Sequence, residues 1–527
     1  MTTLTYVPIV VDGNVIWDQP INTPNGVLGL DASGNVSSAK LLKPGALVSE
    51  TLLQAASDRG YSIREFNGSG SILTTTGTIA SGSNTVTLAA AIDFANGQGI
   101  NVAGAGTSGA NLVTTIVSGA GTTTLILAAS AATAVSNAAA IHDDSNAFQT
   151  AINTLVFPGA IARLFFPLGV YNVAWPMQNN GDNILAAIQL PYIPNTGIPA
   201  TLILEGEGII SNYAEFTSSL NTPFTGTILN FTSPGAGLSN PTAISANSTG
   251  GFTAINLYMR NLHLRTPWLT GTGSDKTMLW LDNLANLNMD NVTIDTSFGS
   301  SLTGATEPQT ANFALRTPLL GNYGSVRVNN VYIVGFFNGL LHSEHAVLDG
   351  VFIQCCRIGI SLISGYHAAY WKRVLIQECA IPINGANLPI YGDLDLEFTT
   401  TGGNWYNTSQ LIINGGGTTG EIKYNAVANG GVSDITTLGP FPAGLKFTNI
   451  NGSRLAASSV TVTASPFAYT ASQLGTVYVS GGTVSAITLT RRGVIIPTGV
   501  TSGAIGVATG DIVTITYSAA PTVNYVP

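Results

Sequence analysis

Residues that could do chemistry gather in two short segments, which read LHSEHAVLDG at 341–350 and GYHAAYWKR at 365–373. Three of the five histidines of the chain lie here, together with Glu344. Imidazoles and carboxylates exchange protons, and aromatic faces stack on other rings and on apolar surfaces. The pattern predicts either a turn carrying polar groups or part of a glycan groove. The substrate-binding residues of that groove would be His342, His345, Tyr366, His367, Tyr370 and Trp371.

The central region has few acidic residues. Their predicted neighbours divide them into candidate catalytic residues and residues with structural roles. Hydrolysis of a glycan needs one protonated and one ionised carboxyl group, roughly 5 Å apart in retaining enzymes and roughly 6.5–9.5 Å apart in inverting ones. Glu344 and Glu378 have no lysine or arginine as a predicted fixed partner, so we predict them as the catalytic pair, with Asp282 in reserve. A site shared between subunits is an equal alternative. Three aspartates have predicted cationic neighbours and suit structural roles: Asp290, Asp295 and Asp349.

Five segments align without gaps and predict the elements that position these residues. Self-similarity at intervals of about 20–50 residues indicates a solenoid, and the intervals here are 30, 39, 20 and 23 residues. Each segment alternates apolar with polar residues, and Asn or Gly marks the turn in all but the last, which has Arg373. The segments are MRNLHLR at 259, MDNVTID at 289, VNNVYIV at 328, LDGVFIQ at 348 and WKRVLIQ at 371.

This alignment predicts which residues become neighbours on adjacent strands, about 4.8 Å apart. Several pairs have complementary chemistry, which an accidental alignment would not produce in a chain so poor in charge. Cys356 falls beside Cys379, and we expect free core thiols there, because adjacent parallel strands seldom offer disulfide geometry. The other pairs are Arg260–Asp290, Arg265–Asp295, Asp349–Lys372, Glu344–His367 and Gln354–Gln377.

Composition argues for an all-β chain and against several classes of function. Only 9% of the 527 residues are charged and the net charge is −9, so no basic stripe could bind nucleic acid. No run of eighteen apolar residues predicts a membrane span, and the N-terminus lacks a secretory pattern. Three cysteines are too few for a disulfide framework. Nucleotide, nucleophile-elbow and zinc-protease motifs are missing, so we expect no cofactor and no metal.

The remaining segments predict separate modules around the repeats. Residues 70–141 alternate polar with apolar residues between Gly-rich turns, which predicts an inserted β module. A helix follows at 143–155, for which Asp143 or Asp144 would serve as a cap rather than as a metal ligand. Residues 457–527 predict a C-terminal β module, and residues 1–60 a distinct N-terminal region with short hairpins.

Joined across the insertion, SIREFNGSGS, HDDSNAFQTAI, LFFPLGVYNV and LILEGEG resemble the entry segment of the pectate-lyase-like superfamily. The resemblance covers 61–69 and roughly 142–380, and it implies a right-handed parallel β-helix over 61–69 and 142–456. The phrase GVLGLDASGNV near the N-terminus resembles the first segments of phage tail fibres and spikes. The paired aspartates and Gly-His-Gly of polygalacturonases are missing, and the calcium-and-arginine arrangement of pectate lyases is not recognisable.

The combined resemblance implies a phage or prophage tailspike. Such a protein would be a homotrimer located in the virion tail, extracellular, attached to a tail or baseplate protein through residues 1–60. Its β-helix would recognise, and as a depolymerase cleave, a host cell-surface polysaccharide, while 457–527 would clamp the trimer, bind glycan or cap the solenoid. Fold does not decide activity, so a non-catalytic receptor-binding spike is the alternative, and a secreted bacterial pectate-lyase-like enzyme is a third reading.

Overall fold

The computed structural model describes most of the chain from residue 60 onward. The described residues are 9–11, 14–17, 40–42, 49–51, 60–174, 178–179, 185–194, 198–208, 226–232, 241–246, 252–267, 277–297, 313–317, 325–399, 408–429, 442–449, 457–471 and 474–526. Among them, no helix combines the length and the apolar character that crossing a membrane requires.

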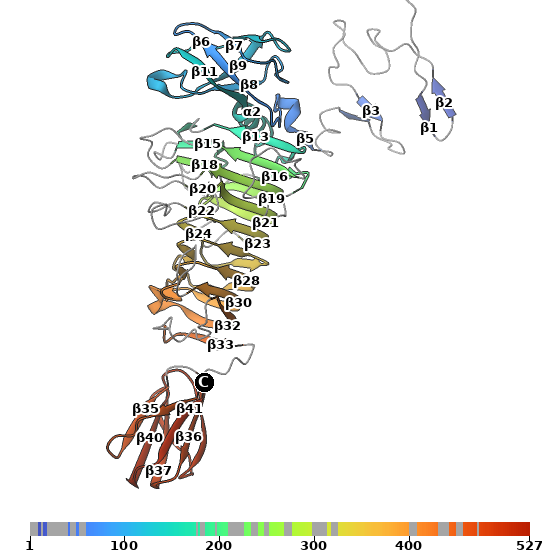
Figure 1. Cartoon of the computed structure of the whole chain (residues 1–527). Coiled ribbons are helices and arrows are strands. Elements are labelled where there is room, and N and C mark those ends of the chain that lie inside the picture. The colour runs from blue at the N-terminus through green and yellow to red at the C-terminus, as the bar shows by residue number, and fades with distance from the viewer. Residues whose placement is uncertain are drawn as a thin grey trace, which may run out of the picture.

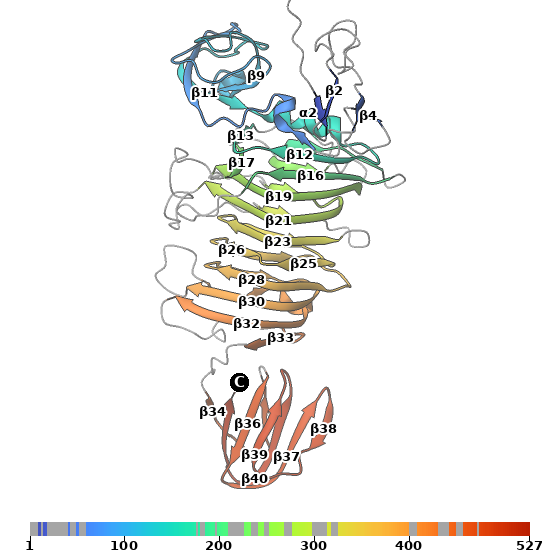
Figure 2. The same ribbon diagram turned by 90° about the vertical axis from the view of Figure 1, so that its right-hand side faces the viewer.

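Two stacks of parallel strands form the body of the molecule, and they appear as two columns in Figure 1. Every strand pair in the two stacks is parallel except β14–β15, so the predicted all-β fold with a parallel β-helix is confirmed. Figure 2 shows the 14-stranded long sheet face-on. Its strands are β5 (Tyr61–Ser62), β12 (Ile161–Phe166), β13 (Gly169–Val173), β16 (Ala200–Gly206), β17 (Thr227–Phe231), β19 (Thr253–Pro267), β21 (Leu284–Ser297), β23 (Val326–Val334), β25 (Ala346–Asp349), β26 (Phe352–Gln354), β28 (Ala369–Gln377), β30 (Pro389–Thr399), β32 (Thr419–Asn429) and β33 (Leu445–Asn449).

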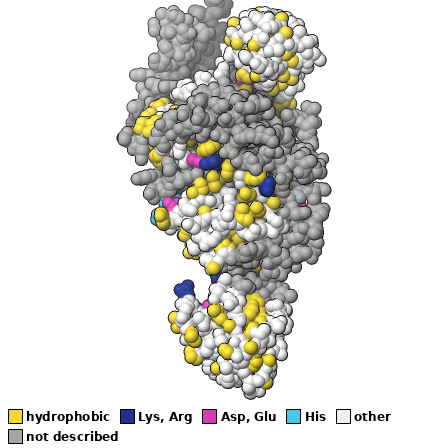
Figure 3. Space-filling model, turned by 90° about the vertical axis from the view of Figure 1, so that its left-hand side faces the viewer, with side chains coloured by type: hydrophobic (Ala, Val, Ile, Leu, Met, Phe, Trp, Pro, Cys, Tyr) yellow, Lys and Arg dark blue, Asp and Glu magenta, His cyan; other side chains and the backbone are white. Residues whose placement is uncertain are grey.

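The second, nine-stranded sheet closes the other side of the coils. Figure 3 views the molecule from the left-hand side of Figure 1, and the described surface there carries only scattered charged side chains. The strands of the second sheet are β14 (Gln178–Asn179), β15 (Leu185–Leu190), β18 (Pro241–Ala246), β20 (Thr277–Trp280), β22 (Phe313–Arg316), β24 (Asn338–His342), β27 (Ile358–Leu362), β29 (Ile381–Asn384) and β31 (Ile412–Ile413).

The long strands turn a corner at one residue in each of five successive coils. That residue has a left-handed backbone, with φ between 48° and 68°, at Asn261, Asn291, Asn330, Gly350 and Arg373. Asn and Gly tolerate this conformation, whereas an arginine there is uncommon. The Arg373 side chain is held by its Nε–H bond to Asp349, 2.7 Å long. The predicted turn positions are therefore the corners of the solenoid, including the one that departs from the Asn/Gly pattern.

The aligned segments pair in the predicted register. Met259, Met289, Val328, Leu348 and Trp371 follow one another on adjacent strands and all point into the core. At the corner, the side-chain N–H of Asn291 donates to Oδ1 of Asn261 in the preceding coil over 2.8 Å. Alternation of the side chains thus packs one face of each strand inward, which is the main source of stability in such a coil.

The predicted charge pairs are register neighbours, but one of them does not bond. Arg265 and Asp295 form a buried ion pair of 2.9 Å, and Lys372 bonds Asp349 at 3.1 Å. Arg260 lies beside Asp290 in the sheet, yet its guanidinium bonds Glu205 of the preceding coil at 2.7 Å. Glu205 also accepts from Arg163 at 2.5 Å. Glu205 lies on β16, outside the five aligned segments. The alignment therefore could not predict that Glu205 binds Arg260 in place of Asp290.

A closed six-stranded barrel occupies the place of the predicted insertion. It has a hydrophobic core of its own, which includes Val86, Ile100, Ile116 and Leu125. Its last strand runs two residues past the predicted boundary of 141 and leads directly into the helix. The barrel strands are β6 (Thr74–Ile79), β7 (Thr85–Leu88), β8 (Gly99–Val102), β9 (Leu112–Ser118), β10 (Thr124–Leu127) and β11 (Val135–Asp143).

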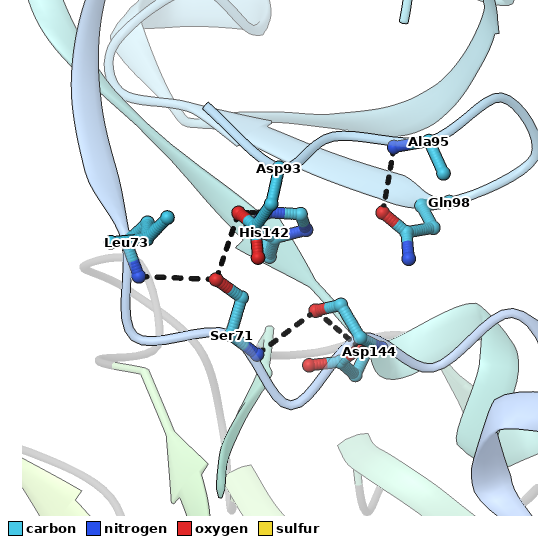
Figure 4. Close-up of polar contacts among 8 residues, drawn as sticks. Ser71, Leu73, Asp93, Ala95, Gln98, His142 and Asp144 are labelled. Atoms are coloured by element: carbon cyan, nitrogen blue, oxygen red, sulfur yellow. Dashed lines mark hydrogen bonds and ion pairs between the residues drawn. The ribbon is translucent and has the colours of Figure 1, made fainter. Parts of the chain in front are cut away.

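The helix α2 covers Ser145–Leu155, two residues shorter than the predicted 143–155. Asp144 occupies the N-cap position without a side-chain cap bond. Its carboxylate instead accepts from the backbone N–H and hydroxyl of Ser69, at 2.6 and 3.2 Å, and from the N–H of Asn172, at 3.1 Å. Asp144 therefore joins the two halves of the entry segment across the barrel, at the junction drawn in Figure 4. There His142 Nε2 lies 2.9 Å from Asp93 Oδ1, which also accepts from the Ser71 hydroxyl.

Beyond the coils lies a module of two four-stranded antiparallel sheets with a separate core. Its strands are β34 (Ser458–Val460), β35 (Phe467–Thr470), β36 (Gly475–Ser480), β37 (Thr483–Arg491), β38 (Val494–Pro497), β39 (Gly503–Val507), β40 (Ile512–Ala519) and β41 (Thr522–Val526). In the N-terminal region, two hairpins pair β1 (Ile9–Val11) with β2 (Asn14–Trp17) and β3 (Lys40–Leu42) with β4 (Ser49–Thr51). The rest of 1–59 lies outside the described residues.

Candidate functional site

The predicted neighbours Glu344 and His367 do meet. Glu344 lies in the turn between β24 and β25, and its Oε2 accepts the backbone N–H groups of Tyr366 and His367 at 2.6 and 2.7 Å. The same oxygen lies 3.2 Å from Nδ1 of His367. Burial alone would raise the pKa of Glu344, but the two N–H groups and the nearby histidines outweigh it and lower that pKa. Glu344 is therefore an ionised carboxylate that fastens one coil to the next.

The two histidines beside Glu344 stack on each other. The ring centroids of His345 and His367 are 4.7 Å apart with 26° between the planes. His345 has a left-handed backbone, with φ of 61°, and its backbone N–H bonds the carbonyl of Ala368. Among the described residues, one group of three has the spacing to hold a metal ion, namely Glu344, His345 and His367, whose ligand atoms lie within 4.8 Å of one another.

An exposed tyrosine surface begins next to this cluster. Tyr370 on β28 and Tyr391 on β30 are register partners, and their rings stack with centroids 6.1 Å apart. Their exposed fractions are 55% and 45%, and that of Tyr366 is 95%. Val347 on β25 continues the same outward row and is also exposed. We call Tyr366, Tyr370 and Tyr391 the tyrosine face.

Two of the predicted substrate-binding residues lie in the core instead. Trp371 is 2% exposed, and its indole N–H donates to Nε2 of His342 over 3.2 Å. His342 is fully buried, and its Nδ1 lies 2.9 Å from the carbonyl of Ser343. Burial lowers the pKa of His342 to about 4. Because both rings are buried in this chain, neither can stack on a sugar, and the prediction of His342 and Trp371 as substrate-binding residues is wrong. The pleat of β28 turns Trp371 inward, whereas its neighbour Tyr370 points outward.

The two predicted catalytic glutamates do not form a pair within one chain. Glu344 contacts the residues before β28, and Glu378 follows the end of β28. At about 3.3 Å per residue the nine-residue strand between them, even with its corner, separates them by roughly 20 Å or more. That distance is far beyond what a shared glycosidic bond allows.

Glu378 lies in surroundings opposite to those of Glu344. It is buried, has a left-handed backbone, and its Oε2 lies 3.7 Å from the thiol of Cys355. Burial raises the pKa of Glu378, and the charge of Glu397 on the next coil raises it further, against the bond from Cys355. The backbone N–H of Glu378 bonds the carbonyl of Glu397 at 2.9 Å. Glu378 and Glu397 are thus neighbouring acidic residues on adjacent coils.

Asp282 has a cationic partner that was not expected from the sequence. Arg316 donates through Nε at 3.1 Å and through a second, shorter bond, while its guanidinium lies 4.0 Å from the ring centroid of Trp280. Burial raises the pKa of Asp282 in spite of the Arg316 bonds. Asp282 and Arg316 belong to coils of the second sheet, so the reserve acid lies apart from both glutamates.

A buried polar network on the long sheet was predicted only in part, because the Arg265–Asp295 pair was expected and the contact of His263 was not. His263 Nε2 lies 2.8 Å from Asp295 Oδ1, which also accepts from Arg265, and all three side chains are buried. His263 and Arg265 are two residues apart and so share a strand face, which was the available signal. The histidine and the arginine together lower the pKa of Asp295 against the effect of burial.

The three cysteines are free thiols, as predicted, and all are buried. Burial raises the pKa values of Cys355 and Cys379 far above the ordinary thiol value. Protonated buried thiols are poor nucleophiles and poor metal ligands. The three cysteines are therefore not part of the candidate site.

No protein-family model matches the sequence, and no curated protein sequence is similar to it. Solved structures of phage tailspikes resemble the fold at low identity. The tailspike gp49 of Acinetobacter baumannii bacteriophage Fri1, a capsular polysaccharide depolymerase, is 10% identical, with 88% of this chain and 97% of that chain covered and a TM-score of 0.25. The tailspike of E. coli bacteriophage HK620 in complex with a hexasaccharide is 9% identical, with 73% and 89% covered and a TM-score of 0.28.

A third tailspike, Gp54 of Acinetobacter baumannii bacteriophage AP22 in complex with a capsular saccharide, is 10% identical. The coverage is 86% of this chain and 82% of that chain, and the TM-score is 0.23. These likenesses concern the general architecture alone.

Proposed function

We propose that this protein is a tailspike-like receptor-binding protein of a phage or prophage, and that its tyrosine face binds a host cell-surface polysaccharide. The observation that carries the proposal is the exposed stack of Tyr370 on Tyr391, held on two adjacent strands, with the exposed Tyr366 in the turn before the first of them. Contiguous exposed apolar surface is uncommon on soluble proteins and often marks an interaction site. Tyrosines offer an apolar face together with a hydroxyl, which suits the alternating apolar and hydroxyl surfaces of a sugar.

The scaffold favours binding because it holds the rings in place before the ligand arrives. Tyr370 and Tyr391 project from strands whose inner faces are packed by Trp371, Ile390 and Leu394. Side chains on rigid strands lose little entropy on binding, so more of the contact energy appears as affinity. The same outward row carries Arg327 in one direction and Glu421 in the other, which can bond sugar hydroxyls or charged sugars.

The architecture around this face supports a place in a virion tail, outside the cell. Residues 1–60, whose sequence resembles tail-fibre segments, would attach to a tail or baseplate protein. The C-terminal module would clamp a homotrimer or bind glycan. The trimer can be tested independently of glycan binding, by light scattering coupled to size-exclusion chromatography, for which a monomer would be the contrary result.

Binding can be tested with the whole chain on a panel of capsular polysaccharides and lipopolysaccharides. Tyr370→Ala and Tyr391→Ala should each weaken binding of the recognised glycan about tenfold, as is usual for a central aromatic contact. Tyr192→Ala is the matched control, because Tyr192 is also exposed but lies after β15 near the second sheet. Equal losses in the control and the test variants would point to a general effect on the protein rather than to the tyrosine face.

Cleavage of the bound polysaccharide is the second candidate function, favoured by Glu378 and Glu397. A buried carboxyl group with a raised pKa is suited to donate a proton, and a neighbouring carboxylate can act as base or nucleophile. The proposed pair is therefore Glu378 with Glu397 rather than Glu378 with Glu344. Mass analysis of oligosaccharides released from the recognised glycan should show release by the wild type and none by Glu378→Gln or Glu397→Gln. Undiminished release by both variants would eliminate the pair, and binding without any release would leave a non-catalytic spike.

A further inference from the structure

We propose that Glu344, His345 and His367 form a binding site for a zinc-like divalent transition-metal ion. From the sequence we expected no metal, because no familiar spacing of ligands occurs along the chain. The three ligands come instead from two successive coils, which the solenoid brings into register. The inference goes beyond the proposed function, since it requires no glycan.

The ligand atoms are nearly close enough already. They lie within 4.8 Å of one another, whereas ligands on a tetrahedral zinc ion, with bonds of about 2.0–2.1 Å, stand about 3.3 Å apart. The approach needed is small, and the side chain of His367 is 59% exposed to solvent. Glu344 is fixed by the bonds on Oε2, while its Oε1 accepts no hydrogen bond from the described residues.

The position of the histidines is unusual for this chain. Of its five histidines, His142, His263 and His342 are buried, and His345 and His367 are the two that solvent reaches. These two lie together with stacked rings next to a carboxylate. Accessible imidazole chemistry in this protein is therefore confined to one place.

The donor set selects the kind of ion. Two imidazoles and one carboxylate suit zinc and its transition-metal neighbours, whereas calcium and magnesium take oxygen ligands almost alone. Three protein ligands leave one tetrahedral position open for water or for an oxygen of a ligand. A bound ion would join the turn at Ser343–His345 to the turn at Tyr366–His367, directly beside the tyrosine face.

The test uses the full chain after removal of metal with a chelator. Isothermal titration with zinc chloride should show one ion bound per chain, calcium and magnesium should show none, and zinc should raise the melting temperature. His367→Ala and His345→Asn should each weaken zinc binding at least about tenfold. Asparagine is used at 345 because it tolerates the left-handed backbone. Circular dichroism checks that each variant is folded.

Two controls distinguish this site from the tyrosine face and from the cysteines. Tyr370→Ala, on the neighbouring tyrosine face, should leave zinc binding unchanged while it weakens glycan binding. Cobalt bound at the site should give visible d–d bands without a thiolate charge-transfer band. Zinc binding that persists undiminished in the His345→Asn/His367→Ala double variant would overturn the proposal. A thiolate band, or no zinc binding by the wild type, would overturn it as well.

Discussion

The inner and outer faces of β28 place adjacent aromatic residues in opposite environments. Trp371 is buried, with its N–H bonded to His342, and Tyr370 is exposed, with its ring on Tyr391. From the sequence, both belonged to one candidate groove. The difference shows that clustering along a strand does not predict a site, because every second residue of a strand points away from it.

The largest contrast between the two faces is expected in stability. Trp371→Ala should cost about 3–5 kcal/mol of the free energy of unfolding, since it removes a large core side chain and leaves a cavity. Tyr370→Ala should change it by about 0.5 kcal/mol or less, as an exposed substitution away from the core usually does. Denaturant or thermal melts of the two variants make the comparison. Similar losses in both would show that the register of β28 is wrong.

This part of the fold was predictable from residue patterns, and the structure makes clear why. The aligned segments already placed Trp371 in the column of Met259, Met289 and Leu348, so alternation alone would have assigned it to the core. The corners, the strand register and the Glu344–His367 contact follow from the same alignment. All three features depend on a repeat in the sequence, because a parallel solenoid stacks each repeat directly on the next.

Other features depended on coils that the alignment does not cover. Asp282 forms an ion pair with Arg316 of the second sheet, and Arg260 forms an ion pair with Glu205 instead of with Asp290, its predicted partner. Lysine and arginine side chains are long enough to reach several acidic residues, so the strand register alone does not predict which ion pair forms. The periodicity places His263 on the same outward face as Arg265, but it does not predict that this side chain is buried.

The next effect is the pH dependence of stability that His342, a residue of the core, is expected to cause. The pKa of His342 is about 4 in the folded chain against an ordinary 6.5. Its contribution to stability is therefore present above about pH 6.5 and lost as the pH falls towards 4, and it amounts to about 3 kcal/mol. Protonation would also remove the acceptor for the Trp371 N–H. Melting temperatures between pH 7 and pH 4, taken with a chelator present, measure the loss.

His342→Gln provides the comparison, because an amide oxygen can accept the Trp371 bond without titrating. The variant should lose less stability than the wild type over this range. Buried Asp143 and Asp144, whose pKa values are raised to about 6 and about 7, act in the opposite direction: their contribution falls as the pH rises from about 4 to 7. Asp143 and Asp144 are present in both the wild type and the variant. The difference between the two pH profiles therefore reports on His342 alone. Parallel pH profiles for the two proteins would contradict the buried, neutral imidazole.

The smallest effect is expected for the exposed ion pair of Lys372 with Asp349. Lys372 and Asp349 are bonded at 3.1 Å, but the lysine side chain is mostly exposed, so Lys372→Ala should cost less than about 1 kcal/mol. The buried pair gives the contrast, because Arg265→Ala leaves Asp295 buried with only His263 and should cost about 3–5 kcal/mol. Equal costs, measured by denaturant unfolding, would mean that burial does not distinguish the two pairs.

The central claim is that the tyrosine face binds a host surface polysaccharide, and a direct binding titration tests it. The glycan that the wild-type chain recognises should bind the Tyr370→Ala/Tyr391→Ala double variant at least about tenfold more weakly. Because the two rings stack on each other, the losses of the two single variants are not expected to add. Tyr192→Ala should bind it as the wild type does, and all three proteins should melt at similar temperatures. A double variant that binds the same glycan with wild-type affinity would contradict the account.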